Sequence, residues 1–190
     1  MRYSGIALVG QPGSGKTTVG AELAQLIGAK RLSFAKVLKE DLSAMLALQD
    51  SGVATEKSPD FWAAFQHHYD QQRHPTTKDA YRPLQQALGA FRRAQDVDYW
   101  VKRAMTGVNN QDFYVVDDCR YRNEYDALRN RHFAFLLLKP GPTTRPLTGA
   151  QAEHESERDW PHFPTDGQFE FVEGPAEMAR IIAVACRLID

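Results

Sequence analysis

One eight-residue stretch near the start of the chain restricts its fold more than any other feature. Residues 10–17 are Gly-Gln-Pro-Gly-Ser-Gly-Lys-Thr and fit the P-loop pattern G-x-x-x-x-G-K-[ST] at every specified position. An apolar run at 6–9 precedes this loop, and a helical pattern at 18–27 follows it. Between a strand and a helix, such a loop can wrap a polyphosphate with backbone N–H groups at a helix N-terminus. We therefore expect the chain to bind a nucleoside triphosphate.

Two side chains at the end of this P-loop are expected to bind phosphate and metal. Lys16 is expected to reach the β- and γ-phosphates, and the Thr17 hydroxyl to enter the coordination shell of Mg²⁺. A mere turn between strand and helix is the alternative, but it gives no reason for lysine and threonine to follow the last glycine. The residues predicted to bind ATP here are Gly10, Pro12, Gly13, Ser14, Gly15, Lys16, Thr17 and Thr18.

Length and composition exclude several classes of protein. A chain of 190 residues suits one α/β domain with one sizeable core. Its net charge of −1 creates no basic field for DNA or RNA, and no apolar run approaches the roughly 20 residues that cross a bilayer. Cys119 and Cys186 lack metal-ligand spacing, and Cys119 is expected to be a small buried side chain. Without a signal peptide, we expect a cytoplasmic protein with no nucleic-acid or membrane partner.

Apolar runs alternate with helical patterns along the whole chain. Strands are expected at 3–9, 30–34, 112–117, 132–138 and 168–172, and helices at 15–27, 35–48, 58–75, 77–91, 96–105, 121–131 and 178–188. Continuous apolar strands separated by helices favour a parallel sheet covered on both faces. We therefore predict an α/β fold, a three-layer P-loop NTPase sandwich around a central parallel sheet.

Two stretches do not fit the bare sandwich. A helical block at about 50–108 lies between sheet strands, and an irregular stretch at about 140–165 is rich in proline, threonine and charge. A small-molecule kinase keeps its acceptor-binding region and its lid at these places. The expected organisation is a single domain over 1–190, with its core at about 1–48 and 110–190.

Carboxylates follow the strand at 112–117. Two valines run into Asp117 and Asp118, which is the form of a Walker B strand end. A carboxylate there can hold a water of the Mg²⁺ shell or orient the attacking oxygen. Thr17, Asp117 and Asp118 are therefore the candidate metal residues, and the sequence leaves open which aspartate serves the metal.

Two arginines lie just beyond these carboxylates. Arg120 and Arg122 fall outside the carboxyl edge of the predicted sheet, where open α/β sheets bind ligands. Guanidinium groups suit phosphate, so both arginines, with Lys16 and Asp118, are the catalytic candidates. The alternative is a solvated helix start, with Asp118 as its cap and the arginines paired with nearby acids.

One face of a predicted helix gathers cations and no acids. Lys78, Arg82, Gln86, Gly89 and Arg93 follow one another at spacings of four, four, three and four, which place them on one helical face. A monophosphate needs cations, and a base needs an amide that both donates and accepts. This cationic face therefore predicts a site for a nucleoside monophosphate, the alternative being a basic solvated surface.

Taken together, the motifs resemble the phage-type deoxynucleoside monophosphate kinases over about residues 5–175. The resemblance rests on the P-loop, Ser33-Phe34-Ala35-Lys36-Val37-Leu38-Lys39, Arg82-x-Leu84-x-Gln86-x-Leu88-Gly89, Asp118-x-Arg120-Tyr121-x-Asn123-Glu124 and His154-x-Ser156-Glu157. Ala90 and Phe91 follow Gly89 where the family often has Thr-Glu or Thr-Asp. Thr165 replaces the asparagine of the family's Asn-Asp-Gly, so we carry over no base preference.

The resemblance implies transfer of the ATP γ-phosphate to a deoxynucleoside monophosphate (dNMP), giving the diphosphate and ADP with Mg²⁺. Family members are bacteriophage enzymes that supply DNA synthesis, which would place the chain in the host cytoplasm. Some form dimers, which leaves a homodimer open here.

The same resemblance distributes the remaining site residues. Arg82, with Lys78 or Arg93, would hold the acceptor phosphate, and Gln86, or Gln85 if the helical register is shifted by one residue, would touch the base. Phe34 and Lys36 are further acceptor-binding candidates, although core packing is the alternative for Phe34. Arg145 would reach ATP from the lid, with an ordinary loop arginine as its alternative.

Two other functions stay open. The first is a P-loop kinase for another small acceptor, such as a sugar, a nucleoside or a modified deoxynucleotide; the cationic face disfavours an uncharged acceptor. The second is a nucleotide-dependent ATPase switch, which would show ATP turnover stimulated by DNA and unaffected by monophosphates.

Overall fold

The computed structural model describes residues 3–50, 82–141, 158–170, 172 and 174–189. The chain divides into two compact units, of which the first, the sheet unit, comprises 1–33 and 105–190. The second, the helical unit, comprises 34–104. The predicted helix at 58–75, Lys78, Arg145, the 154–157 motif and most of the predicted lid lie outside the described residues.

A five-stranded parallel sheet forms the centre of the sheet unit. Its strands are β1 (Gly5–Val9), β2 (Lys30–Leu32), β3 (Tyr114–Val116), β4 (Phe133–Lys139) and β5 (Gly167–Glu170), in the order β2-β3-β1-β4-β5. Every pairing among these described strands is parallel. The predicted central parallel sheet is confirmed, with strand ends that lie within two residues of the expected ones.

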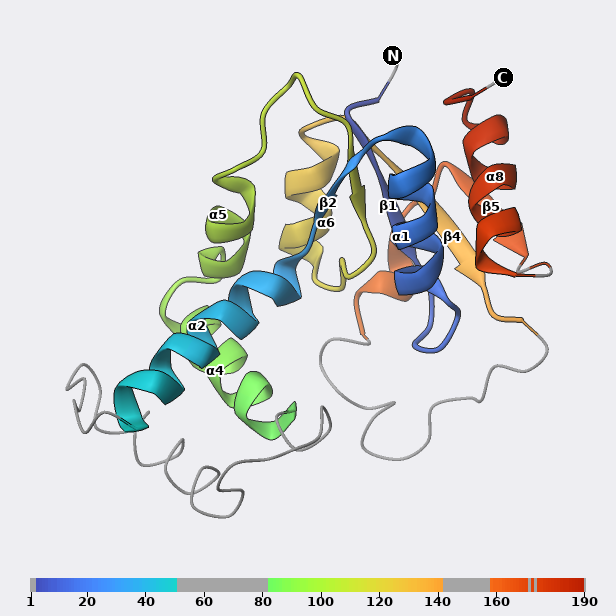
Figure 1. Cartoon of the computed structure of the whole chain (residues 1–190). Helices are drawn as coiled ribbons and strands as arrows, with labels where there is room; N and C mark the ends of the chain where they lie inside the picture. The colour runs from blue at the N-terminus through green and yellow to red at the C-terminus, as the bar shows by residue number, and fades with distance from the viewer. Residues whose placement is uncertain (1–2, 51–81, 142–157, 171, 173, 190) are drawn as a thin grey trace. The chain divides into compact units, whose positions relative to one another are not determined.

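Helices cover both faces of this sheet. On one face, α1 (Lys16–Ile27) and α8 (Pro175–Ala185) lie side by side (Figure 1), and their apolar residues share a core with those of β1, β3 and β4. On the other face, the Tyr125 ring of α6 (Arg122–Arg129) packs 4.4 Å from Phe135 and 4.7 Å from Phe163. The sheet unit is therefore the expected three-layer sandwich.

Burial along the strands follows their position in the sheet. All five residues of β1 and all three of β3 are buried, as befits central strands covered on both faces. The edge strand β5 alternates between half-buried and exposed residues, and β2 buries only its last residue. The continuous apolar runs in the sequence therefore mark the inner strands.

The helical unit consists, in its described part, of α2 (Phe34–Asp50), α4 (Arg82–Gln95) and α5 (Tyr99–Met105). Its core contains Leu42, Leu84, Leu88 and Trp100. The Trp100 Nε1–H donates to the Gly89 carbonyl at 3.2 Å, which ties α5 to α4. This unit includes α2, which the sequence-based interpretation placed in the core. The predicted division into core, acceptor-binding insertion and lid stays a prediction.

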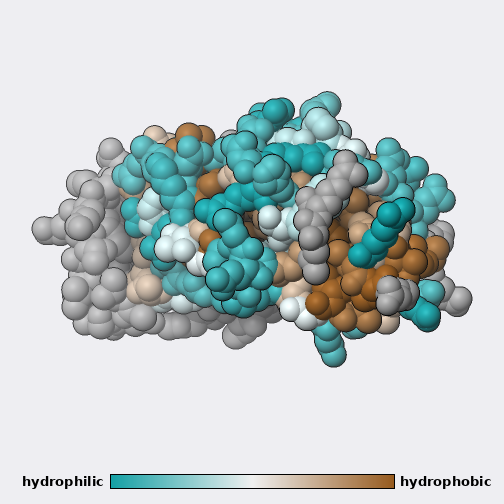
Figure 2. Space-filling model, turned by 90° about the horizontal axis from the view of Figure 1, so that it is seen from above, coloured by the Kyte–Doolittle hydropathy of each residue, from teal (hydrophilic) through white to brown (hydrophobic). Residues whose placement is uncertain are grey.

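An apolar surface lies on the sheet unit. Figure 2 shows hydrophobic residues gathered on one part of the surface, over α1 and α8, where Leu26 and Val184 are exposed. Leu26 lies at the opposite end of α1 from the P-loop. This surface is therefore separate from the candidate site.

Candidate active site

The P-loop joins the carboxyl end of β1 to the first turn of α1, and its backbone requires glycine. Gly10, Gly13 and Gly15 have φ angles of 147°, 83° and 84°, which side-chain-bearing residues rarely adopt. A Cβ on Gly10 would also lie 2.4 Å from the Leu138 carbonyl oxygen. The loop conformation thus demands glycine at the two positions that the motif specifies, Gly10 and Gly15, and also at Gly13 between them.

Lys16 folds back over this loop. Its Nζ donates to the carbonyl oxygens of Gly10 and Gln11, each at 2.6 Å, and lies 3.4 Å from Ser14 Oγ. Thr17 and Thr18 are exposed in the first turn of α1, a turn that contains no acidic residue. A cation, exposed hydroxyls and a helix N-terminus without acids fit a bound triphosphate.

The Walker B carboxylates share a sheet edge with the P-loop. Strand β3 lies beside β1, so the carboxyl ends of the two parallel strands meet at the same edge. A Cβ added to Gly20 would lie 3.2 Å from Asp117 Cβ, which shows that α1 packs directly on this aspartate. Gly20 is four residues after Lys16, so the two share a face of α1. The structure therefore brings Asp117 to the helix face that carries the P-loop lysine.

Each of the two aspartates has a partner from β2 or the residue that follows it. Asp117 is buried, and its Oδ2 accepts from Arg31 Nη2 at 2.8 Å. The Asp118 Oδ2 accepts from Ser33 Oγ at 2.6 Å. The sequence analysis missed Arg31, and it used Ser33 only as part of a motif. Arg31 could have been identified because it is a charged residue inside the short strand predicted at 30–34.

Among the described residues, no group of three His, Cys, Asp or Glu side chains could hold a metal ion. At this edge, Thr17 and one aspartate are the residues that could hold a magnesium ion together with phosphate oxygens, which is how Mg²⁺ is bound alongside nucleotides. The hydroxyl and carboxylate oxygens present here are hard donors that fit this ion.

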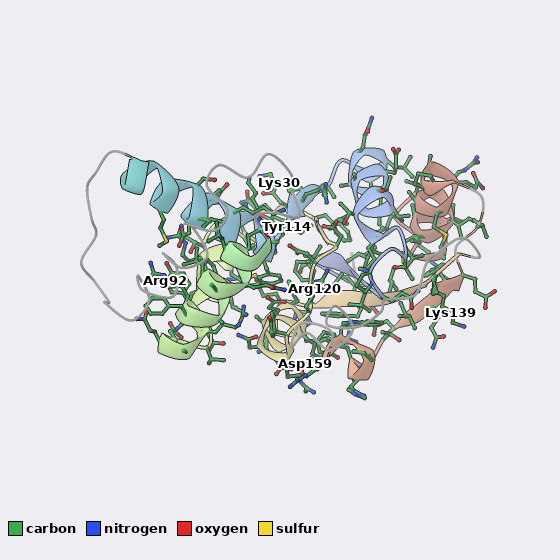
Figure 3. The ribbon with its side chains drawn as sticks, turned by 90° about the horizontal axis from the view of Figure 1, so that it is seen from below. Lys30, Arg92, Tyr114, Arg120, Lys139 and Asp159 are labelled. Atoms are coloured by element: carbon green, nitrogen blue, oxygen red, sulfur yellow. The ribbon has the colours of Figure 1, made fainter. Side chains whose placement is uncertain are left out.

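The Asp-x-Arg-x-x-Asn-Glu element forms a fixed loop before α6. The buried Glu124 carboxylate accepts from the backbone N–H groups of Arg120 at 2.8 Å and Tyr121 at 3.1 Å. The glutamate of the motif therefore holds the backbone that carries Arg120, which is half-buried. Arg120, which precedes α6 in the chain, is labelled in Figure 3. Because α6 begins at Arg122 with Tyr121 as its N-cap, Asp118 is not the helix cap, and that part of the alternative is wrong.

Arg122 has the surroundings of a surface arginine. Its side chain is 64% exposed, and its Nε donates to Asp126 Oδ1 at 2.9 Å on the same helix. Its backbone N–H donates to Asp159 Oδ2 at 2.9 Å, and Asp159 is labelled in Figure 3. Pairing with a nearby acid is the alternative that the sequence left open for this residue, and its catalytic role stays a prediction.

The described part of the cationic face lies on α4. Gln86 is exposed, and Arg93 is half-buried. A Cβ on Gly89 would lie 3.1 Å from Leu38 Cδ1 and 3.4 Å from both terminal nitrogens of Arg93. Packing against α2 and against the arginine therefore explains the glycine, and its contact with an acceptor stays a prediction. Arg82 begins α4.

The other acceptor candidates differ in exposure. Phe34 is buried, as its packing alternative requires. Lys36 is exposed and lies 3.7 Å from Glu40 in a pair one helical turn apart. The structure groups Phe34, Lys36, Gln86, Gly89 and Arg93 in the helical unit, and the P-loop, Arg31, Ser33, Asp117, Asp118 and Arg120 in the sheet unit.

Two further sequence features have structural roles. Burial raises the pKa of the Cys119 thiol well above 9.0, which keeps it a neutral, buried side chain as predicted. Asp166, in the segment that replaces Asn-Asp-Gly, accepts from Phe135 N–H at 2.7 Å and from Arg129 Nη1 at 2.6 Å. This aspartate therefore fastens the start of β5 to β4 and α6. No helix in the described part of the chain is both long and apolar enough to cross a membrane.

Comparisons with known proteins give remote similarities of fold. No protein-family model matches the chain, and a search of curated proteins gives no match. Several solved structures are similar to the chain, among them the following three. A sugar kinase from Janibacter sp. is 18% identical, with 98% of this chain and 95% of that chain covered and a TM-score of 0.44. A shikimate kinase from Acinetobacter baumannii in complex with shikimate is 15% identical, with 97% and 94% covered and a TM-score of 0.46. A gluconokinase from Sinorhizobium meliloti is 20% identical, with 99% and 95% covered and a TM-score of 0.46. At these scores, the similarities assign neither a family nor an acceptor.

Proposed function

We propose that this chain is a Mg²⁺-dependent kinase that transfers the γ-phosphate of ATP to a deoxynucleoside monophosphate, giving the diphosphate and ADP. The observation that carries the proposal is the grouping at one sheet edge of the P-loop, Lys16 and the Asp117–Asp118 carboxylates. Gly20 lets α1 pack on Asp117, which supports a Walker A and Walker B pair rather than a chance motif match.

The residues of this chain would bind and orient ATP. The P-loop amides and Lys16 hold its phosphates, while Thr17 and one aspartate hold Mg²⁺. When bound, the metal would supply neutralisation of the phosphate charge. Lys16 first has to exchange its contacts with Gly10 and Gln11 for phosphate oxygens, and an ammonium group with three rotatable donors can do so.

Arg120 would neutralise the negative charge on the transferring phosphoryl group. Glu124 fixes the backbone of Arg120 and Tyr121, so the guanidinium starts from a defined position beyond β3. Phosphoryl transfer depends on positioning and electrostatic stabilisation more than on covalent chemistry. A nucleoside monophosphate is already an anion near neutral pH, so the proposal requires no general base.

The cationic face of the helical unit would bind the acceptor. Arg93, held against Gly89, and Arg82, at the start of α4, supply positive charge, and the exposed Gln86 supplies an amide. Closure of the segment at about 140–165 with Arg145 would exclude water during transfer. The base preference is left to experiment because the departures at residues 90–91 and 165 fall in two of the family's motifs.

A coupled ADP-release assay tests this function. The full chain is mixed with ATP, Mg²⁺ and, in turn, each of the four common dNMPs and their ribonucleotide counterparts. Turnover that requires one or more dNMPs supports the proposal, and the active set defines base and sugar preference. Turnover only with a nucleoside or sugar would replace the acceptor, and turnover that responds to DNA but to no monophosphate would favour the ATPase switch.

A further inference from the structure

The segment at 158–166, which we call the strap, contacts both ends of α6. At the first residue of the helix, the Arg122 backbone N–H donates to Asp159 Oδ2 at 2.9 Å. At the last residue, Arg129 Nη2 donates to the Pro164 carbonyl oxygen at 2.9 Å. The strap and α6 are therefore joined at two points that are one helix length apart.

The far end of the strap is fixed to the sheet. The buried Phe163 packs its ring 4.7 Å from the Tyr125 ring of α6. Asp166 Oδ2 accepts from the Phe135 backbone N–H at 2.7 Å and from Arg129 Nη1 at 2.6 Å. In return, the Asp166 backbone N–H donates to the Phe135 carbonyl oxygen at 2.7 Å. Phe135 belongs to β4, which pairs with β1, so the strap is attached to the neighbour of the strand that leads into the P-loop.

Asp159 adds a restraint on the loop before α6 that Glu124 does not supply. Glu124 accepts from the N–H groups of Arg120 and Tyr121, but it belongs to α6 and so fixes the loop relative to the helix. Asp159 comes from a different segment and accepts from the next N–H along the chain, that of Arg122. A carboxylate bound to a backbone N–H at a helix start makes a strong hydrogen bond and interacts favourably with the helix dipole. Two carboxylates from different segments thus hold three successive N–H groups.

We propose that Asp159 is a positioning residue that fixes the Arg120 loop relative to the P-loop. This role rests on the proposed function, because it concerns the arginine that would neutralise charge on the transferring phosphoryl group. The connection runs from Arg120 through the first residue of α6 to Asp159, and through the strap to β4 and β1. Phosphoryl transfer depends on the placement of charge, and a displacement of about 1 Å can lower the rate as much as 100-fold. Asp159 and Arg120 are both labelled in Figure 3.

Steady-state kinetics with ATP and the active monophosphate test this role. Asp159→Ala, which removes the acceptor for the Arg122 N–H, should lower kcat about tenfold and leave the KM for ATP unchanged, because Arg120 is misplaced while the P-loop is intact. Asp159→Asn keeps an acceptor oxygen and should recover most of the wild-type kcat.

Asp126→Ala is the matched control. Asp126 Oδ1 pairs with the side chain of Arg122 at 2.9 Å, whereas Asp159 binds the backbone of the same residue. Exposed ion pairs contribute little, so this variant should change kcat by less than about twofold. Loss of a carboxylate beside Arg122 would then have an effect only where that carboxylate holds the backbone.

The deciding measurement repeats Asp159→Ala in the Arg120→Met background. There it should change the residual kcat by less than about twofold, because the group that Asp159 positions is already gone. Tm should fall by the same amount in both backgrounds, because the carboxylate at the start of α6 is lost in each. A merely structural carboxylate would lower Tm and leave kcat unchanged at temperatures where the variant is folded.

Unchanged kcat in Asp159→Ala, or a tenfold loss that persists in Arg120→Met, would overturn this role. If Asp159→Ala fails to fold, Asp159→Glu decides instead. It keeps the charge at the start of α6 but carries its carboxylate one methylene further out, so it should fold and still lower kcat several-fold, and wild-type kcat would contradict the role. Wild-type protein that transfers no phosphate to any dNMP would overturn the proposed function itself, whereas the other outcomes leave that function standing.

Discussion

The ammonium nitrogen of Lys16 lies 2.6 Å from the carbonyl oxygen of Gly10, so the cation near the end of the P-loop is held by the residue that opens it. This contact shapes the loop around the position where phosphate oxygens would replace the carbonyls. It also means that Lys16 serves both the conformation of the loop and its proposed chemistry.

Lys16→Met should lower kcat for phosphoryl transfer at least about 100-fold, because it removes a charge that stabilises the transferring phosphates. Steady-state kinetics with ATP and the active monophosphate provide the measurement. Lys139→Met is the control, since Lys139 is a partly exposed lysine that pairs with Glu170 at 3.5 Å on the edge strand β5. Equal activity of the two variants would contradict the role of Lys16.

The two arginines after β3 should differ in their contribution. Arg120→Met is expected to lower kcat about 1,000-fold, as loss of an arginine that stabilises phosphoryl transfer does. Arg122→Met should cost far less, because Arg122 is exposed and paired with Asp126 on its own helix. The comparison of kcat in the two variants checks this, and similar losses in both would remove the distinction.

Adjacent arginines on α4 allow a matched test of the acceptor site. Arg93→Met should raise the KM for the monophosphate about tenfold or more, because a hydrogen bond to a charged group contributes roughly 1.5–3 kcal/mol. The guanidinium of Arg92 lies 5.1 Å from the Tyr99 ring and packs against it, so Arg92→Met should lower Tm and leave this KM unchanged. An unaltered acceptor KM in Arg93→Met would count against the cationic face.

The turn before β3 should show a pH-dependent stability. Asp112 Oδ2 lies 2.6 Å from both Lys30 Nζ and Asn109 Nδ2, and the hydrogen bond from Lys30 lowers the pKa of Asp112 below 3.8. The folded state therefore binds the proton less tightly than the unfolded state. This contribution to stability is fully present above the unfolded pKa and is lost as pH falls through the lowered folded pKa.

Asp112→Asn should accordingly lower Tm near neutral pH, and its difference from wild type should shrink in acid below the ordinary pKa of 3.8. Thermal unfolding of both proteins over this pH range provides the measurement. A difference in Tm that stays constant into acid would show that the carboxylate charge is not what stabilises the turn.

The sequence predicts the central strands and the P-loop because their signals are local. The apolar runs that become β1 and β4 are contiguous, and the P-loop glycines lie within a few residues of one another. Element ends are less predictable. The helix expected at 121–131 ends at Arg129 because the chain turns through His132, which has a φ of 58°. The strand expected from Asp112 begins at Tyr114 because Asn109 Oδ1 accepts from the Asp112 backbone N–H in a turn.

Site residues that lie in one short segment could be predicted from the sequence. Contacts between site residues from distant segments could not. The Arg31–Asp117 ion pair joins residues 86 positions apart, and only the pairing of β2 with β3 brings them together. Gly89 shows the converse. Its place on a cationic face predicted an approaching ligand, but Leu38 and the guanidinium of Arg93 already occupy the space beside it.

The fate of the γ-phosphate is the direct test of phosphoryl transfer to a dNMP. Full-length chain is incubated with Mg²⁺, a dNMP and ATP labelled on its γ-phosphate, and the products are separated, with Lys16→Met as the negative control. We expect the label to appear in the deoxynucleoside diphosphate, in equal amount to the ADP formed, and Lys16→Met to abolish it. Label released only as inorganic phosphate, at a rate that no dNMP changes, would contradict this expectation.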